Sequence, residues 1–158
     1  MNKSALIDKS IKALRSELET YVRVANSSHE EATAEENRAE NKYDTRGLEA
    51  SYLATGQANK VVELEDAIGA FEDLKAKSFD DSPIDIGALV ELDQNGEKAF
   101  YFIGPSAGGT EITDGVHEVL VITPQSPLGT QLQGQQHGDR LELTLAGAKQ
   151  LVQIVDVC

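Results

Sequence analysis

Residues 7–25, IDKSIKALRSELETYVRVA, carry the pattern that decides the architecture of the first half of the chain. Apolar side chains recur there at alternating steps of four and three residues, at Ile7, Ile11, Leu14, Leu18, Tyr21 and Ala25. This is the a/d spacing of a helix that buries one narrow stripe against a partner. Because a single helix cannot bury such a stripe by itself, we expect a second helix alongside it.

A second stripe with the same spacing follows further along the chain. It runs through Tyr43, Gly47, Ala50, Ala54, Gln57, Val61, Leu64, Ile68 and Phe71. Residues 1–78 contain no proline and only three glycines, which suits two long helices. Folded back on each other, the two segments would form an antiparallel coiled-coil hairpin over residues 1–78, with arms of about 35 residues and roughly 50 Å.

Residues 29–46, HEEATAEENRAENKYDTR, join the two stripes and form the predicted tip of the hairpin, near residues 30–46. Three of their six acids, Glu36, Glu40 and Asp44, follow one another at helical i, i+4 spacing. Like charges at that spacing repel unless solvent or a cation relieves them. The stretch is therefore either a solvated turn or a functional tip. Its carboxylates could complete a Mg²⁺ site that a partner already holds, because Mg²⁺ prefers oxygen ligands.

Residues 82–158 have the composition of a β-rich domain, since they hold all four prolines and ten of the thirteen glycines. Runs of alternating apolar residues flank Asn95-Gly96, which is a hairpin signal, and further runs follow from His117 onward. We expect about five antiparallel strands, preceded by a linker at residues 77–84. The glycine-rich residues 104–115 are predicted to be a loop.

One short helix is expected among these strands, within residues 126–134. Ser126 suits the N-cap, Pro127 the first helical position and Gly134 the end. The fold class predicted for the whole chain is α+β, with a helical hairpin at residues 1–78 followed by a small β-rich domain at residues 82–158.

Charge and composition exclude several classes of function. The net charge of −13 argues against direct binding to nucleic acid, which needs a basic surface. Cys158 is the single cysteine, and the three histidines are not placed at metal-ligand spacing, so we expect no cofactor or metal of the protein's own. Neither a signal peptide nor a membrane-spanning run is found, which predicts a cytoplasmic protein without a membrane partner.

The second half contains a motif that resembles the bacterial Gre family of transcript-cleavage factors, as does the order of acidic hairpin, ENKY sequence at residues 40–43 and β-rich domain. The matching positions are Ser126, Pro127, Leu128, Gly129, Leu132, Gly134, Gly138 and Asp139. The resemblance covers essentially the whole chain. It implies an FKBP-like domain at residues 82–158 that docks on bacterial RNA polymerase, and a coiled coil that enters the secondary channel toward the catalytic Mg²⁺.

The resemblance also implies site residues. Ser126, Pro127, Leu128 and Gly129 are candidates for docking on the polymerase, although a role in the fold alone explains them equally well. At the tip, Glu36, Glu40 and Asp44 are the candidate acids toward the polymerase Mg²⁺, with Asn37, Asn41 and Tyr43 as supporting residues.

The tip departs from the family pattern, which resembles Asp-Leu-x-Glu-Asn-Ala-Glu-Tyr. Glu40 and Asn41 match the Glu-Asn pair, whereas Asn37 and Lys42 stand where the family has acids. We therefore predict a monomeric elongation factor that binds RNA polymerase and contacts backtracked RNA only indirectly. It either stimulates the polymerase's own RNA hydrolysis or, as the alternative, competes with active cleavage factors without cleavage. A third reading is a coiled-coil adaptor unrelated to transcription.

Overall fold

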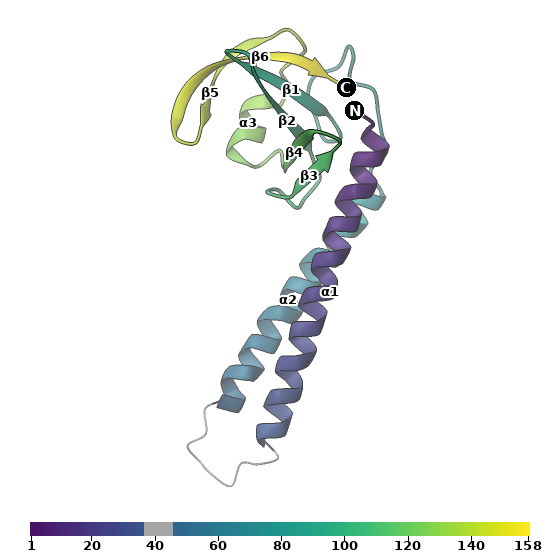
Figure 1. Cartoon of the computed structure of the whole chain (residues 1–158), viewed down its shortest axis with the longest axis vertical. Coiled ribbons are helices and arrows are strands. Elements are labelled where there is room, and N and C mark those ends of the chain that lie inside the picture. Colours follow the sequence, from purple (N-terminus) through teal and green to yellow (C-terminus); the bar gives the residue numbers. More distant parts are fainter. Residues whose placement is uncertain (37–45) are drawn as a thin grey trace. The chain divides into compact units, whose positions relative to one another are not determined.

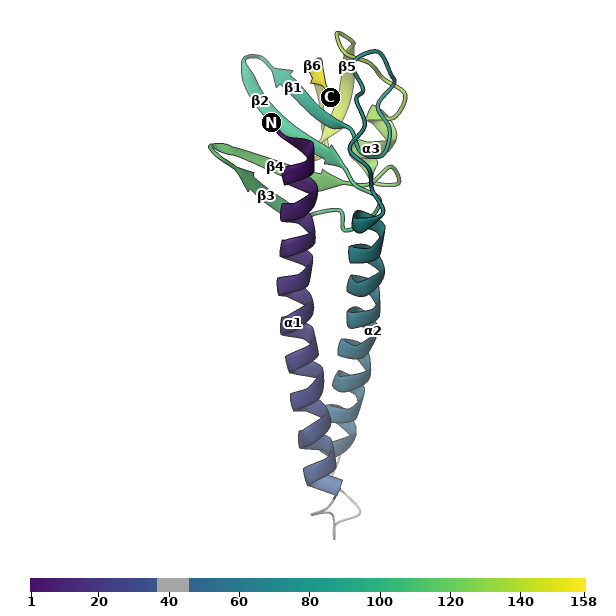
Figure 2. The same cartoon turned by 90° about the vertical axis from the view of Figure 1, so that its right-hand side faces the viewer.

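The computed structural model describes the backbone of residues 1–36 and 46–158. Within these ranges, the side chains of residues 25, 28, 29, 31–36 and 46–55 are not described. The chain is α+β, as predicted, with helices in its first part and a six-stranded mixed sheet in its second. Figures 1 and 2 show the two long helices, α1 (Lys3–Glu36) and α2 (Arg46–Glu72).

The described residues form two compact units. One is helical and runs from Leu14 to Ile68, and the other, which we call the β-rich unit, joins Met1–Ala13 to Gly69–Cys158. The division predicted from composition, into residues 1–78 and 82–158, stays a prediction. The division into compact units instead assigns the first 13 residues, together with those from Gly69, to the sheet.

In the helical unit, the segments of α1 and α2 lie alongside each other and run in opposite directions (Figures 1 and 2). The predicted stripe is the least exposed face of both segments. Leu14, Leu64 and Ile68 are buried, and Leu18 and Val61 are partly buried. Val22 and Val62, which lie off the stripe, are exposed. Most of the buried side chains described in this unit therefore lie on the predicted stripe, whereas the antiparallel coiled-coil hairpin itself stays a prediction.

The β-rich unit contains one sheet with the strand order β3-β4-β2-β1-β6-β5 (Figure 1). Its strands are β1 (Leu89–Gln94), β2 (Glu97–Ile103), β3 (Glu111–Asp114), β4 (His117–Ile122), β5 (Arg140–Leu145) and β6 (Ala148–Val157). A short helix, α3 (Pro127–Leu132), lies between β4 and β5 in the chain. This helix and the hairpin around Asn95-Gly96 confirm the sequence predictions, and both turn residues have positive φ angles of 54° and 91°.

Two features of the sheet correct the sequence predictions. Residues 111–114, which were expected to belong to a loop, form the edge strand β3 and pair with β4 across a turn at Gly115, whose φ is +66°. Because β3 leads the chain back, β4 runs parallel to β2, so the sheet is mixed and not wholly antiparallel. The first error arose because β3 has only four residues, two of them acidic, and follows a glycine-rich segment.

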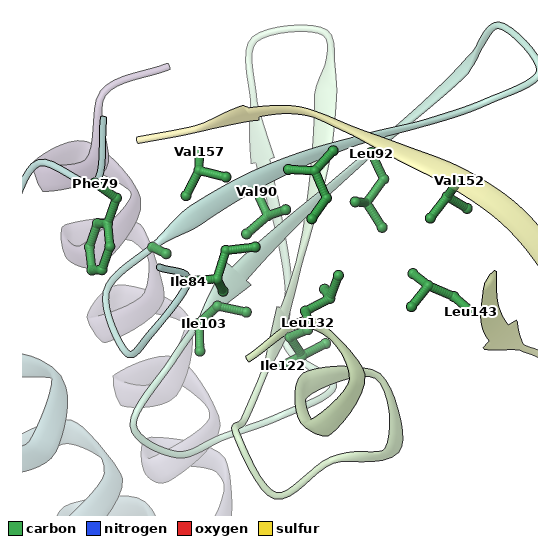
Figure 3. Packing of buried hydrophobic residues seen from close by; sticks show 12 residues of the cluster. Phe79, Ile84, Val90, Leu92, Ile103, Ile122, Leu132, Leu143, Val152 and Val157 are labelled. Carbon is green, nitrogen blue, oxygen red and sulfur yellow. The ribbon is translucent and has the colours of Figure 1, made fainter. Parts of the chain in front are cut away.

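The core of the β-rich unit lies between the sheet and α3 (Figure 3). It contains Phe79, Ile84, Ala88, Val90, Leu92, Ile103, Ile122, Leu132, Leu143, Val152, Ile154 and Val157. Two of these residues come from the segment 77–84, which was predicted to be a linker. Ile84 is held further by two backbone hydrogen bonds, in which its N–H donates to Gln135 O and Gly134 N–H donates to its carbonyl. Phe79 and Ile84 of this segment are thus part of the core, whereas residues 80–83 between them are exposed.

The β-rich unit also includes the beginning of α1, up to Ala13, and the end of α2, from Gly69. These two helical parts pack against the other face of the sheet. Leu6 and Phe71 are fully buried, and the Phe71 ring lies 6.4 Å from the ring of Phe102 on β2. Gly104, just after β2, leaves room for this contact, because a Cβ there would sit 3.0 Å from the Phe71 ring and 2.8 Å from Val121. This face of the sheet is therefore covered around Phe102.

Candidate functional site

In the sequence, the predicted tip includes the last residues of α1 and continues to the first residue of α2. Glu36 is the last residue of α1, and its side chain is not described. Glu40, Asp44, Asn37, Asn41 and Tyr43 lie outside the described residues. The roles assigned to these six residues stay predictions.

The described end of α1 nevertheless has an electrostatic property that bears on the tip. The last turn of this helix includes Glu35 and Glu36 and contains no basic residue. Residues 37–45 lie outside the described residues, so α1 is described only as far as Glu36. The sequence around this point concentrates negative charge, and negative charge attracts cations.

The second predicted site is the turn from β4 into α3. Ser126 is the N-cap of α3, with φ of −67° and ψ of 155°. Its Oγ accepts a hydrogen bond from Gly129 N–H at 3.0 Å and donates one to the carbonyl of Thr123 at 2.7 Å. The hydroxyl thus satisfies one free N–H of the helix start and fixes the preceding turn.

Gly129 is required by the packing of the same turn. A Cβ at this position would lie 1.9 Å from the carbonyl oxygen of Thr123. Leu128 is partly buried against the core, and Pro127 is exposed at the first helical position. Three of the four predicted docking residues therefore have a role in the fold, and Pro127 is the one whose side chain is mainly open to solvent. Docking on a polymerase stays a prediction for all four.

The remaining motif residues also have local structural reasons. Leu132 is fully buried, and Gly134 and Gly138 have φ angles of +82° and +87°, which only glycine adopts readily. The Asp139 carboxylate accepts a hydrogen bond from Gln136 N–H at 2.8 Å. The motif at residues 126–139 is thus a set of positions that this turn and helix demand.

One polar cluster was missed by sequence reasoning. Lys9, near the start of α1, donates to the Thr113 carbonyl at 3.0 Å and pairs with the Asp114 carboxylate at 2.7 Å, which holds the pKa of Asp114 below its ordinary value. Lys3 donates to the Lys77 carbonyl and lies 4.7 Å from the centre of the Phe79 ring. No sequence pattern signals these contacts, because Lys9 and Asp114 are 105 residues apart.

The described residues hold neither a cluster of metal ligands nor a helix suited to a membrane. In residues 1–36 and 46–158, no three His, Cys, Asp or Glu side chains with described positions gather where they could hold a metal ion. In the same part of the chain, no helix combines the length and apolar character that crossing a membrane requires.

Comparison with known proteins found similarity only among solved structures, since no family model and no curated protein matches the chain. The crystal structure of GreA factor homolog 1 (Gfh1) of Thermus thermophilus has 22% identity and a TM-score of 0.40, and the match covers 94% of both chains. Gfh1 of Thermus aquaticus has 20% identity and a TM-score of 0.41, covering 98% of this chain and 93% of the other.

A third structure, the transcription elongation factor GreA/GreB from Nitrosomonas europaea, has 17% identity and a TM-score of 0.36. The match covers 65% of this chain and 89% of the other. Similarity at this level leaves the function to be argued from the residues of this chain. These three structures are each described as a Gre factor or a Gre factor homolog.

Proposed function

We propose that this protein is a transcription elongation factor that binds bacterial RNA polymerase and inserts its paired helices, acidic end first, into the secondary channel. The observation that carries the proposal is the motif at residues 126–139, which forms one capped, closely packed turn and helix. At most of the positions that resemble the Gre family pattern, this local structure restricts the residue type, as Gly129 beside Thr123 O shows. These positions support a Gre-type β-rich domain, and docking on the polymerase is proposed with it.

The helical unit supplies the second support. The large apolar residues of the predicted stripe, such as Leu14, Leu64 and Ile68, are among the least exposed side chains described in this unit. Two helices paired in this way carry residues 29–46 at one end, which is the arrangement that a narrow channel would admit. A regular coiled coil and an FKBP-like fold of the β-rich unit are part of this proposal.

At the tip, Glu36 and Glu40, with Asp44 as an alternative, would contact the Mg²⁺ that the polymerase holds. That metal supplies an activated water and stabilises charge on the phosphate during hydrolysis of RNA. The protein's own contribution would be the negative charge of the acidic stretch at residues 29–46, which attracts and holds cations. The protein needs no metal of its own for this role, and the hydrolysis would be that of the polymerase.

A second candidate function is a regulator that occupies the channel without promoting cleavage. It is favoured by Asn37 and Lys42, which replace acids of the family pattern. An amide cannot bind a metal as an anion, and an ammonium group repels one. With a single matched acid at Glu40, the tip would block the channel and compete with active cleavage factors.

The test is a transcript-cleavage assay on purified backtracked elongation complexes with Mg²⁺. If the tip is active, we expect stepwise RNA shortening above the polymerase background, lost in the double variant Glu36→Gln with Glu40→Gln. The matched control is Glu19→Gln, which removes an exposed acid from the same helix away from the tip. Suppression of an added cleavage factor without shortening would establish the second function.

A protein that neither shortens RNA, nor suppresses a cleavage factor, nor binds the complex would contradict both candidates. The third reading, an adaptor unrelated to transcription, would then stand.

A further inference from the structure

A pocket of about 470 Å³ lies in the β-rich unit, where β2 and β4 begin. The two strands pair in parallel only from Phe100 and Val119 onward. The residues just before this first pair, Ala99 on β2 and Glu118 on β4, both line the pocket. The opening therefore lies at the point where the two strands separate.

The lining combines apolar, aromatic and acidic groups. Among the residues that form it are Tyr101, Leu120, Val116, Glu111 and Glu118. Val116, in the turn between β3 and β4, is 91% exposed, which is unusual for a large aliphatic side chain. Tyr101 is about half buried, and desolvation raises the pKa of its phenol. A neutral aromatic ring, aliphatic surface and two carboxylates thus share one pocket.

The charges in the pocket are unbalanced. Lys98 also lines it, but its ammonium group lies 2.5 Å from the Glu91 carboxylate and forms an ion pair with it. Within the described part of the chain, neither Glu111 nor Glu118 has an ion-pair partner. The pocket therefore keeps two carboxylates without a counter-ion, and a ligand that enters should be positive.

We propose that this pocket binds the side chain of an arginine or lysine on a basic segment of a partner protein. The aliphatic stem of such a side chain matches Val116 and Leu120, and its charged end matches Glu111 and Glu118. The aromatic side chain of Tyr101 also lines the pocket, and aromatic rings attract cations. A metal ion is a poorer match, because the described residues offer no group of three metal ligands. This inference concerns the isolated protein and does not rest on the proposed function.

The test is an NMR titration of the ¹⁵N-labelled full chain with the peptide acetyl-Gly-Arg-Gly-amide. The matched ligand is the same peptide with citrulline, which keeps the shape of arginine and removes its charge. We expect saturable shifts of the Ala99, Tyr101 and Leu120 amide signals with arginine and none with citrulline. Equal shifts with both peptides, or shifts spread over the acidic surface, would overturn the proposal.

Two double variants distinguish binding in the pocket from a general attraction of the peptide to the negative charge of the protein. Glu111→Gln with Glu118→Gln should weaken binding of the arginine peptide by about fivefold or more, since two exposed ion pairs are lost. The control, Asp81→Asn with Asp85→Asn, removes two exposed acids outside the pocket and should bind within about twofold of the original chain. Equal binding of the peptide by the two double variants would contradict the assignment of the pocket. NMR signals that are unchanged outside the substituted sites would show that both variants remain folded.

Discussion

The segment at residues 123–139, which contains α3 and the turns on either side of it, and the acidic stretch at residues 29–46 differ in what restricts their sequence. In the segment at residues 123–139, the residue types follow from packing and hydrogen bonds, as with the Ser126 hydroxyl and the missing Cβ of Gly129. In the acidic stretch, the pattern is one of charge, and like charges at helical spacing work against stability. Residues that a fold requires identify the fold, whereas residues that cost it stability point to function.

The largest expected effect lies in the segment at residues 123–139. Gly129→Ala should lower the free energy of unfolding by about 3 kcal/mol, because the added methyl overlaps the Thr123 carbonyl and the backbone must shift. Urea denaturation of the full chain measures this change in the free energy of unfolding. The matched control is Gly56→Ala in α2, where a Cβ would meet no atom within 4 Å. That change should stabilise the helix by about 0.5–1 kcal/mol. Equal effects of the two substitutions would break the comparison.

A smaller effect is expected at the helix cap. Ser126→Ala removes both hydrogen bonds of the hydroxyl and should cost about 1 kcal/mol of unfolding free energy, measured in the same way. Ser126→Asp should restore most of the loss, because aspartate also caps helices well. The exposed Ser82 provides a control, since Ser82→Ala should change little. If Ser126→Ala leaves stability unchanged but weakens polymerase binding, the residue serves docking and not the fold.

The acidic stretch should respond in the opposite sense. Glu36→Gln with Glu40→Gln is expected to leave stability unchanged or to raise it by a few tenths of a kcal/mol, since the repulsion between like charges at i, i+4 spacing is removed. The helical signal in circular dichroism during thermal unfolding measures this. A clear loss of stability would mean that these acids are structural, and the comparison would fail.

The smallest effect concerns the contact between Lys9 and Asp114. Because the hydrogen bond from Lys9 lowers the pKa of Asp114 in the folded state, its contribution to stability is present above the unfolded-state pKa. This contribution is lost as the pH falls through the lowered pKa of Asp114 in the folded state. The difference between the original chain and Asp114→Asn should therefore shrink from about pH 5 downward in urea titrations. A difference in unfolding free energy that grows toward acid pH would contradict the assignment. The control is Glu97→Gln, which removes an exposed acid of the same unit.

Local patterns predicted the elements whose cause is local. The Asn95-Gly96 hairpin, the helix capped by Ser126 and the apolar stripes of the two long helices were all readable from spacing and residue type. The parallel pairing of β2 with β4 was not, because it depends on the return of the chain through β3. The core positions of Phe79 and Ile84 were also missed, since an isolated apolar residue beside proline and aspartates resembles a linker.

The candidate sites show the same limit. The motif residues at 126–139 were found by type and spacing, but their structural reasons, such as the distance from Gly129 to Thr123 O, exist only in three dimensions. The pocket between β2 and β4 joins residues near 100 to residues near 118 through a pairing that no sequence pattern indicated. The acids of the tip were found by sequence alone.

Insertion of the acidic end into the polymerase is the central claim, and a tethered cleavage probe tests it most directly. Cys158→Ser removes the single cysteine, and Glu40→Cys then carries an iron chelate that cuts nearby protein and RNA. A second chain carries the probe at Asp81→Cys in the β-rich unit. We predict cuts next to the polymerase's catalytic Mg²⁺ from position 40, and cuts only at the channel entrance from position 81. Cuts from position 40 outside the channel, or none above those of unlabelled protein, would contradict the account.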